Sequence, residues 1–155
     1  MALENIKIVT KNRKARHNYH LLDTYQAGLV LMGSEIKSIR NNHVSIGEAF
    51  VQERDNELWL LNAHIGTYEQ AGSFGHDDPL RPRKLLLRRK EINKLLTEIR
   101  EASFTAIPTM LYLQRGLAKI EIAVARGKRN YDKRQTLAKR DAERQINRAL
   151  KERDR

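Results

Sequence analysis

The sequence predicts a mainly β protein: a small closed barrel of about six strands, flanked by three helical segments and followed by a basic tail. Short apolar runs typical of strands outnumber helical patterns, and the one full amphipathic helix comes late in the chain. Strands and helices do not alternate regularly, which argues against a doubly wound parallel sheet. A glycine inside the longest apolar stretch indicates the kind of bend by which a small barrel closes.

The expected strands are short and separated by turn residues. The clearest pair, 110–114 and 117–125, flanks a turn at 115–116, and its second strand alternates apolar residues with Lys119 and Glu121. This pattern predicts a β-hairpin. The other expected strands are 6–9, 20–32 with a bend at Gly28, 49–51 and 57–65.

A full helix is predicted over 88–102, because its apolar residues follow the i, i+3, i+4, i+7 spacing and charges occupy the other face. Two shorter helical pieces are expected. Residues 12–18 fit a single helical turn or a loop, and 33–40 fit a short helix that Ser34 caps. Glycines and prolines punctuate 67–82, which predicts a loop.

The charge is unevenly distributed. The chain of 155 residues has 30 Lys and Arg against 19 Asp and Glu, a net charge of +11. Residues 126–155 alone carry 12 basic and 5 acidic side chains and few large apolar ones. Because such a segment cannot bury enough apolar surface to offset the entropy of ordering, we expect a folded body at 1–125 and a basic tail at 126–155 that is disordered when free.

Several function classes are excluded or disfavoured. The chain has no cysteine, so disulfides and thiolate sites are impossible. It has no phosphate-binding loop, dinucleotide fingerprint, nucleophile elbow or zinc-ligand spacing. His17 and His20 make a poor metal site, and Asp77 and Asp78 lie in the Gly/Pro-rich loop without a partner for acid–base work. We therefore expect no catalytic residues, no metal and no cofactor.

No apolar run approaches the length that a spanning helix needs, and the first 14 residues lack the apolar core of a secretory signal. We expect a cytoplasmic protein that does not bind membranes. The strong positive charge instead favours a polyanionic partner. Basic residues gather in four places: 11–19, Lys37 with Arg40, 81–90 around a Leu triplet, and 126–134.

The first of these clusters mixes cations, which neutralise phosphates, with amide, imidazole and phenol groups that can meet bases or the 2′-OH of RNA. Several strings then match one family in order and spacing over roughly 5–140. They are Asn12-Arg13-Lys14-Ala15-Arg16-His17-Asn18-Tyr19, Ala27-Gly28-Leu29-Val30-Leu31, Gly33-Ser34-Glu35-Ile36-Lys37-Ser38-Ile39-Arg40, Arg81-Pro82-Arg83-Lys84-Leu85-Leu86-Leu87, Gly127-Lys128 and Tyr131-Asp132-Lys133-Arg134. Together they resemble the SsrA-binding proteins, also called small protein B.

The resemblance implies an oligonucleotide-binding-type β-barrel with three helices. It implies an RNA-binding adaptor, not an enzyme, that binds the tRNA-like domain of transfer-messenger RNA as a monomer and stands in for the missing anticodon arm. The complex would be delivered to stalled ribosomes for trans-translation, which tags the nascent chain. The tail would become helical in the empty mRNA channel, near the decoding centre of the small-subunit RNA.

The resemblance also assigns residues. The RNA-binding positions would be Asn12, Arg13, Lys14, Arg16, His17, Tyr19, Gln26, Lys37, Arg40, Arg83, Lys84, Leu85 and Leu86. The ribosome-binding positions would be Gly127, Lys128, Tyr131, Asp132, Lys133, Arg134, Ile146 and Leu150. One position departs from the family, which usually has Glu where this chain has Gln26, so a role that needs a carboxylate there is in question.

Two other functions stay open at this point. A basic ribosomal or assembly protein that sits permanently on ribosomal RNA would account for the tail equally well, although not for the motifs of the body. An RNA-processing enzyme that uses the acidic loop is a poorer alternative, because nothing in the sequence positions the two carboxylates.

Overall fold

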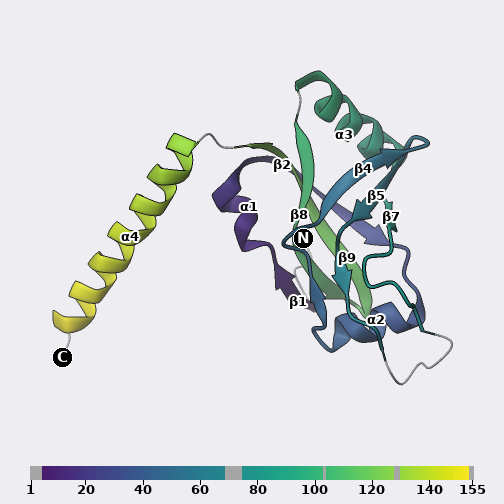
Figure 1. The fold of residues 1–155 in the computed structure, drawn as a ribbon, viewed down its shortest axis with the longest axis horizontal. Coiled ribbons are helices and arrows are strands. Elements are labelled where there is room, and N and C mark those ends of the chain that lie inside the picture. The colour runs from purple at the N-terminus through teal and green to yellow at the C-terminus, as the bar shows by residue number, and fades with distance from the viewer. Residues whose placement is uncertain (1–4, 69–74, 103, 128–129, 154–155) are drawn as a thin grey trace.

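The computed structural model describes residues 5–68, 75–102, 104–127 and 130–153. Figure 1 shows a curled sheet with short helices around it and one long helix to one side. In chain order the elements are β1 (Ile6–Lys11), α1 (Arg13–Asn18), β2 (Tyr19–Leu29), α2 (Gly33–Arg40), β3 (Val44–Ser45), β4 (Phe50–Arg54), β5 (Glu57–Leu61), β6 (His64–Ile65), β7 (Arg83–Leu86), α3 (Arg89–Ala102), β8 (Thr105–Gln114), β9 (Leu117–Gly127) and α4 (Asn130–Arg153).

The predicted mainly β class is confirmed, but the predicted closed barrel is wrong. Seven strands form one antiparallel sheet in the order β1-β8-β9-β2-β7-β5-β4, and β3 pairs separately with β6. In the described part of the chain, no pairing joins the edge strands β1 and β4. A closed barrel has no edge strands, so this sheet is open.

The strands do contain bends, but not at Gly28, where the sequence predicted one. β1, β2 and β8 each contain one register shift, and the one in β2 falls between Leu21 and Thr24. Gly28 is paired regularly with Leu86 and Lys119. A Cβ on Gly28 would lie 3.4 Å from the Cβ of Leu86, an ordinary van der Waals distance, so this contact does not require a glycine. The register shifts bend single strands and do not supply the pairing between edges that closure needs.

The hairpin and the long helix of the body form as predicted. β8 and β9 pair along their length, and the turn residues Arg115 and Gly116 both have positive φ, 52° and 78°. This is the geometry of the two-residue turns that match the twist of a hairpin. The helix α3 buries Ile92, Leu95 and Leu96 in the core, as its apolar spacing predicted.

Strand β7 was not predicted. It has only four residues, Arg83–Leu86, yet it joins β2 to β5 and so completes the seven-stranded sheet. Leu85 is buried, whereas 51% of Leu86 is exposed. A four-residue strand with two basic residues has too little alternation to be distinguished from a charged loop by its sequence pattern.

The start of α2 differs from the prediction that Ser34 is its cap. Met32 occupies the N-cap position, and the carboxylate of Glu35 accepts a hydrogen bond from the backbone N–H of Met32 at 2.8 Å. Ser34 is buried inside the helix, where its Oγ lies 2.7 Å from His76 Nδ1 and accepts the His76 backbone N–H at 3.0 Å. The serine therefore ties the loop before β7 to α2.

Residues 130–153 of the basic tail form the helix α4, which stands beside α1 at one side of the body (Figure 1). Good helix formers (Ala, Lys, Arg, Gln, Glu and Leu) dominate the segment. That the tail is disordered in the free chain and helical on the ribosome stays a prediction. None of the helices within the described residues has the length and apolar character needed to cross a membrane.

Candidate nucleic-acid interface

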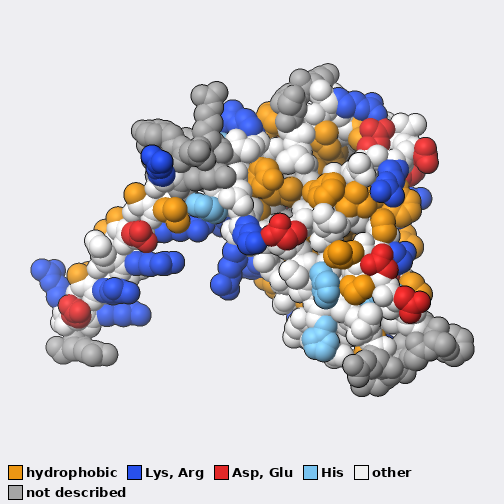
Figure 2. All heavy atoms as spheres, in the orientation of Figure 1, with side chains coloured by type: hydrophobic (Ala, Val, Ile, Leu, Met, Phe, Trp, Pro, Cys, Tyr) orange, Lys and Arg blue, Asp and Glu red, His pale blue; other side chains and the backbone are white. Residues whose placement is uncertain are grey.

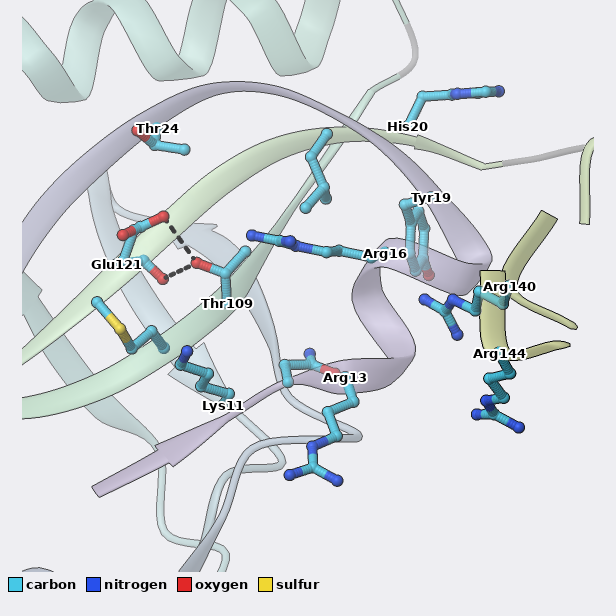
Figure 3. Close-up of a pocket in the computed structure, with 13 residues that line it drawn as sticks. Lys11, Arg13, Arg16, Tyr19, His20, Thr24, Thr109, Glu121, Arg140 and Arg144 are labelled. Atoms are coloured by element: carbon cyan, nitrogen blue, oxygen red, sulfur yellow. Dashed lines mark hydrogen bonds between the residues drawn. The ribbon is translucent and has the colours of Figure 1, made fainter. Parts of the chain in front are cut away.

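A cleft of about 790 Å³ lies between α1 and α4, over parts of β2, β8 and β9 (Figure 3). We call it the α1–α4 cleft. Figure 2 shows Lys and Arg side chains along α4 and on the nearby edge of the body, with a hollow between them. The charged side chains that line the cleft are Lys11, Arg13, Arg16, Arg140, Arg144 and Glu121.

The position of α1 is set by Asn12. Its Oδ1 accepts the backbone N–H of Ala15 at 3.2 Å and caps the helix, while its Nδ2 donates to the carbonyl oxygens of Pro108 at 2.9 Å and Ile46 at 3.3 Å. Asn12 and Ala15 are both buried. Asn12 was predicted to contact RNA, but its side chain is committed to these bonds, so its role in this structure is to hold α1 against β8.

The two sides of α1 have different surroundings. Arg13 and Arg16 line the α1–α4 cleft. Lys14 lies outside that lining and forms an exposed ion pair with Glu48, 2.6 Å between Nζ and Oε1. His17 faces a separate pocket, and its Nδ1 is buried without a hydrogen-bond partner in the described part of the chain. Of the four, the two arginines therefore present their charge to the cleft.

The cleft is strongly positive. For Lys11, Arg13, Arg140 and Arg144, the structure records no ion pair among the residues that it describes. The two arginines of α4 are four residues apart, which places them on one side of that helix. Cations on two facing elements suit a polyanion, because each phosphate can be neutralised from either side.

Glu121 is the acidic member of the lining, and hydrogen bonds hold it. Thr109 Oγ1 donates to Glu121 Oε1 at 3.1 Å, and Gln26 Nε2 lies 3.5 Å from Oε2. The hydroxyl of Tyr112 donates to Gln26 Oε1 at 2.5 Å. Burial, and then the charge of Glu121, raises the pKa of the Tyr112 phenol, so that hydroxyl keeps its proton. Gln26 thus donates to one neighbour and accepts from the other, which a carboxylate at position 26 could not do.

A second candidate surface lies at the other end of β2. Leu86 and Leu117 are 51% and 64% exposed and border a groove of about 380 Å³, whose lining also includes Arg40 and Lys119. We call it the Leu86 groove. The Nη2 of Arg40 lies 3.5 Å from the carbonyl oxygen of Gly116 in the hairpin turn. Of the residues predicted to bind RNA, Arg40 and Leu86 come together here.

Lys37 and Lys84 do not line this groove, although both were predicted to bind RNA. Lys37 Nζ lies 5.4 Å from the centre of the Tyr68 ring, within cation–π range. Lys84 pairs with Trp59 between β7 and β5. Leu85, predicted to contact RNA together with Leu86, is wholly buried in the core and is not available for contact.

Arg83 is the largest correction to the predicted site. Its side chain is 0% exposed, and the guanidinium contacts Glu35 Oε2 through Nε at 2.6 Å and the carbonyl oxygen of Ala63 through Nη1 at 2.6 Å. Arg81 adds a second ion pair to the other oxygen of Glu35. An arginine enclosed in this way cannot reach an RNA phosphate, and its role is to join β7 to α2.

The carboxylate of Glu35 stays ionised despite its burial. Burial by itself raises the pKa of this carboxyl, but hydrogen bonds from Arg81, from the backbone N–H of Met32 and from Arg83 outweigh that effect and bring the pKa below its usual value. Buried ion pairs persist where such additional hydrogen bonds compensate for lost hydration. The network is therefore a structural element, separate from the cleft.

The predicted ribosome-binding residues are distributed between β9 and α4. Gly127 ends β9, and Lys128 lies outside the described residues. Tyr131, Asp132 and Lys133 belong to the first turn of α4, but their side chains are not described. Further along α4, the side chains of Arg134, Ile146 and Leu150 are exposed. The structure thus places most of these residues on one helix.

Sequence reasoning assigned no RNA contact to six polar residues of the cleft lining: His20, Thr24, Thr109, Glu121, Arg140 and Arg144. In the sequence pattern, Glu121 is only a polar position of an alternating strand. Its direct pairing with Gln26 across β2 and β9 depends on the register, which the sequence pattern does not reveal. The two arginines were part of the tail's charge, and their i, i+4 spacing was the available signal.

The fold and the cleft define a small, mainly β protein with a polyanion-binding surface. A family model described as SmpB protein matches residues 9–152, so this chain belongs to that family. Among its relatives, the SsrA-binding protein of Desulfitobacterium hafniense (strain DSM 10664 / DCB-2) is 51% identical over 98% of this chain and 97% of its own length. The SsrA-binding protein of Geobacillus thermodenitrificans (strain NG80-2) is 49% identical over 95% and 94%.

The fold has a counterpart among solved structures. A chain in the structure described as "tmRNA-SmpB: a journey to the center of the bacterial ribosome" aligns with a TM-score of 0.66 and 38% sequence identity. The alignment covers 86% of this chain and 95% of the other. The family resemblance stated from the sequence motifs is confirmed.

Proposed function

We propose that this chain is an RNA-binding adaptor that binds the tRNA-like domain of transfer-messenger RNA and takes part in trans-translation on stalled ribosomes. The observation that carries the proposal is the α1–α4 cleft, in which basic side chains of two elements face one another in a member of the SmpB family. The names of the relatives, and of the ribosome-bound structural neighbour, support transfer-messenger RNA and the ribosome as partners.

The body and α4 have different tasks in this proposal. The body binds the RNA as a monomer, through Arg13 and Arg16 on one side and through the Leu86 groove on the other. The helix α4 enters the empty mRNA channel and contacts the small subunit. The exposed Ile146 and Leu150 support this task, because large apolar side chains exposed on a helix that is otherwise polar indicate a partner surface.

A binding experiment tests the first task. The purified chain is titrated with the tRNA-like fragment of transfer-messenger RNA and with a control duplex of equal length, across a series of salt concentrations. Preference for the fragment that persists at physiological salt supports recognition of RNA shape. Equal affinity for both RNAs, lost together as salt rises, would contradict the proposal and favour a general ribosomal RNA-binding protein.

A truncation after Arg126 tests the second task. Removing α4 deletes Arg140 and Arg144 from the cleft but leaves α1 and the Leu86 groove in place. At physiological salt the truncated chain should retain most of its affinity for the RNA fragment, and it should lose activity in a reconstituted assay for tagging on stalled ribosomes. Retained tagging would show that α4 has no role on the ribosome, and loss of all RNA binding would make it an RNA anchor.

A further inference from the structure

The carboxylate of Glu121 is out of place in a surface that only attracts phosphates. It is the one acidic side chain among the described residues that line the α1–α4 cleft, and the same lining includes five Lys and Arg side chains. A negative charge there weakens the attraction for any phosphate. Its presence in the cleft therefore indicates a ligand that carries hydrogen-bond donors as well as phosphates, because a carboxylate binds donors.

The carboxylate is held in a defined orientation. Thr109 Oγ1 donates to its Oε1 at 3.1 Å, and Gln26, its direct partner across β2 and β9, lies 3.5 Å from its Oε2. Thr109 is anchored as well, since its hydroxyl lies 3.3 Å from the backbone carbonyl oxygen of Glu121. Each carboxylate oxygen accepts about two hydrogen bonds, so both oxygens still have room to accept a donor from the cleft.

We propose that Glu121 recognises the Watson–Crick edge of one unpaired guanine in the bound RNA, an inference that rests on the proposed RNA-binding function. Guanine presents two neighbouring donors on that edge, N1–H and the N2 amino group, and these match the two oxygens of a carboxylate. Single-stranded bases are commonly read through hydrogen bonds to this edge. Lys11, Arg13 and Arg16 would hold the flanking phosphates.

The other three bases fit less well. Adenine and cytosine each place one amino donor beside a ring nitrogen that is itself an acceptor, so one carboxylate oxygen would face a lone pair. Uracil places its single N–H between two carbonyl oxygens. A carboxylate with two available acceptor positions therefore selects guanine in two ways: it attracts the two donors of guanine, and it repels the acceptor atoms of the other bases.

The substitution Glu121→Gln tests the proposal, because the two explanations of Glu121 predict changes of opposite sign. If the carboxylate merely repels phosphate, its neutralisation should tighten RNA binding. If it accepts two donors from guanine, the amide replaces one acceptor by a donor, and binding should weaken roughly tenfold to a hundredfold, the range typical of a lost bidentate base contact. Affinity for the tRNA-like fragment is measured by titration, with thermal unfolding as the check on folding.

Glu48→Gln is the matched control. It removes the same charge from an exposed carboxylate that pairs with Lys14 and lies outside the cleft lining. We expect this variant to bind the RNA as the parent chain does, or slightly more tightly. Thr109→Val removes the positioning hydroxyl but leaves the carboxylate in place, and it should weaken binding in the same direction as Glu121→Gln but by less.

The base itself is identified by interference mapping. Inosine lacks the N2 amino group, so random replacement of guanine by inosine in the fragment should reveal one position that weakens binding to the parent chain but not to Glu121→Gln. Tighter binding by Glu121→Gln, or the same interference pattern in both proteins, overturns the proposal. If the parent chain binds the tRNA-like fragment no better than the control duplex, the proposed function is wrong. This result differs from the two that contradict guanine recognition, so the experiment separates the two proposals.

Discussion

Two groups of charged side chains in this chain have opposite surroundings. Around Glu35, two arginines are paired with one carboxylate, and Arg83 and Glu35 are completely buried. The lining of the α1–α4 cleft, by contrast, includes five basic side chains and one carboxylate around an open volume. Arg81 and Arg83 in the first group, and Arg13 and Arg16 in the second, come from basic motifs that look equivalent in the sequence.

The difference shows how to separate structural from ligand-binding charge. A buried pair whose remaining hydrogen bonds are satisfied holds the fold together, and removing one partner leaves an uncompensated charge in the core. Exposed cations that face one another repel each other, so they favour the binding of a polyanion between them. Substitutions in the first group should therefore change stability, and substitutions in the second should change RNA affinity.

The largest effect is expected for Arg83→Gln. It removes the charge that compensates buried Glu35 and the donor to the Ala63 carbonyl oxygen, so we expect a loss of about 3–5 kcal/mol in the free energy of unfolding. Urea denaturation measures it. Arg81→Gln, at a partly exposed guanidinium, should have a clearly smaller effect. A stable Arg83→Gln protein that has lost only RNA affinity would reverse the assignment.

The pH dependence of stability comes next. Because the pKa of Glu35 is lower in the folded protein than in the unfolded chain, its contribution is fully present above the ordinary Glu value of about 4.3 and is lost as the pH falls through the folded pKa. Stability should therefore decline on acidification below about pH 4.3. Glu35→Gln should be less stable at neutral pH and show a shallower decline. Equal slopes for the two proteins in urea titrations from pH 7 to pH 2.5 would contradict this.

Arg13→Gln/Arg16→Gln should act on binding and not on folding. Both arginines line the cleft, so we expect at least tenfold weaker RNA binding and a salt dependence whose logarithmic slope falls by about one to two. Titrations at several salt concentrations measure both quantities. Lys14→Gln, on the same helix but paired with Glu48, is the control and should leave the slope nearly unchanged. A similar loss in the control would mean that α1 acts only through its net charge.

The smallest effect is expected for Arg140→Gln/Arg144→Gln. These arginines line the cleft from α4, so the double variant should bind RNA several-fold less tightly at low salt, with little difference at high salt. Lys139→Gln/Lys151→Gln changes the same charge on the same helix outside the cleft lining. If both pairs of substitutions weaken binding equally, α4 contributes only its overall positive charge, and Arg140 and Arg144 make no specific contact with RNA in the cleft.

Much of the fold follows from local patterns. The spacing of Ile92, Leu95 and Leu96 predicted α3, and the alternation around a turn at Arg115 and Gly116 predicted the hairpin. These elements are long enough for their periodicity to be distinct. The basic segment around α1 was predicted to contact RNA. Its arginines Arg13 and Arg16 line the cleft, and their contact with RNA stays a prediction.

The candidate site was less predictable, because burial and strand register are not local properties. Arg83 looked like any other cation beside a Leu triplet, and only the approach of Glu35 from α2 makes it a buried residue. The pairing of Gln26 with Glu121 joins residues 95 positions apart. The closed barrel failed for the same reason, since closure depends on how the edges β1 and β4 meet and not on either strand alone.

By itself, the sequence determined the mainly β class, the amphipathic helix, the concentration of positive charge and, through its motifs, the family. These properties depend on composition, on periodicity over a few residues and on short strings, which are readable along the chain. Only the tertiary structure decided which arginines are enclosed and which are open to a ligand, and that one carboxylate lies among the cations of the cleft. These distinctions depend on contacts between elements distant in the chain, whose energies follow from burial and geometry.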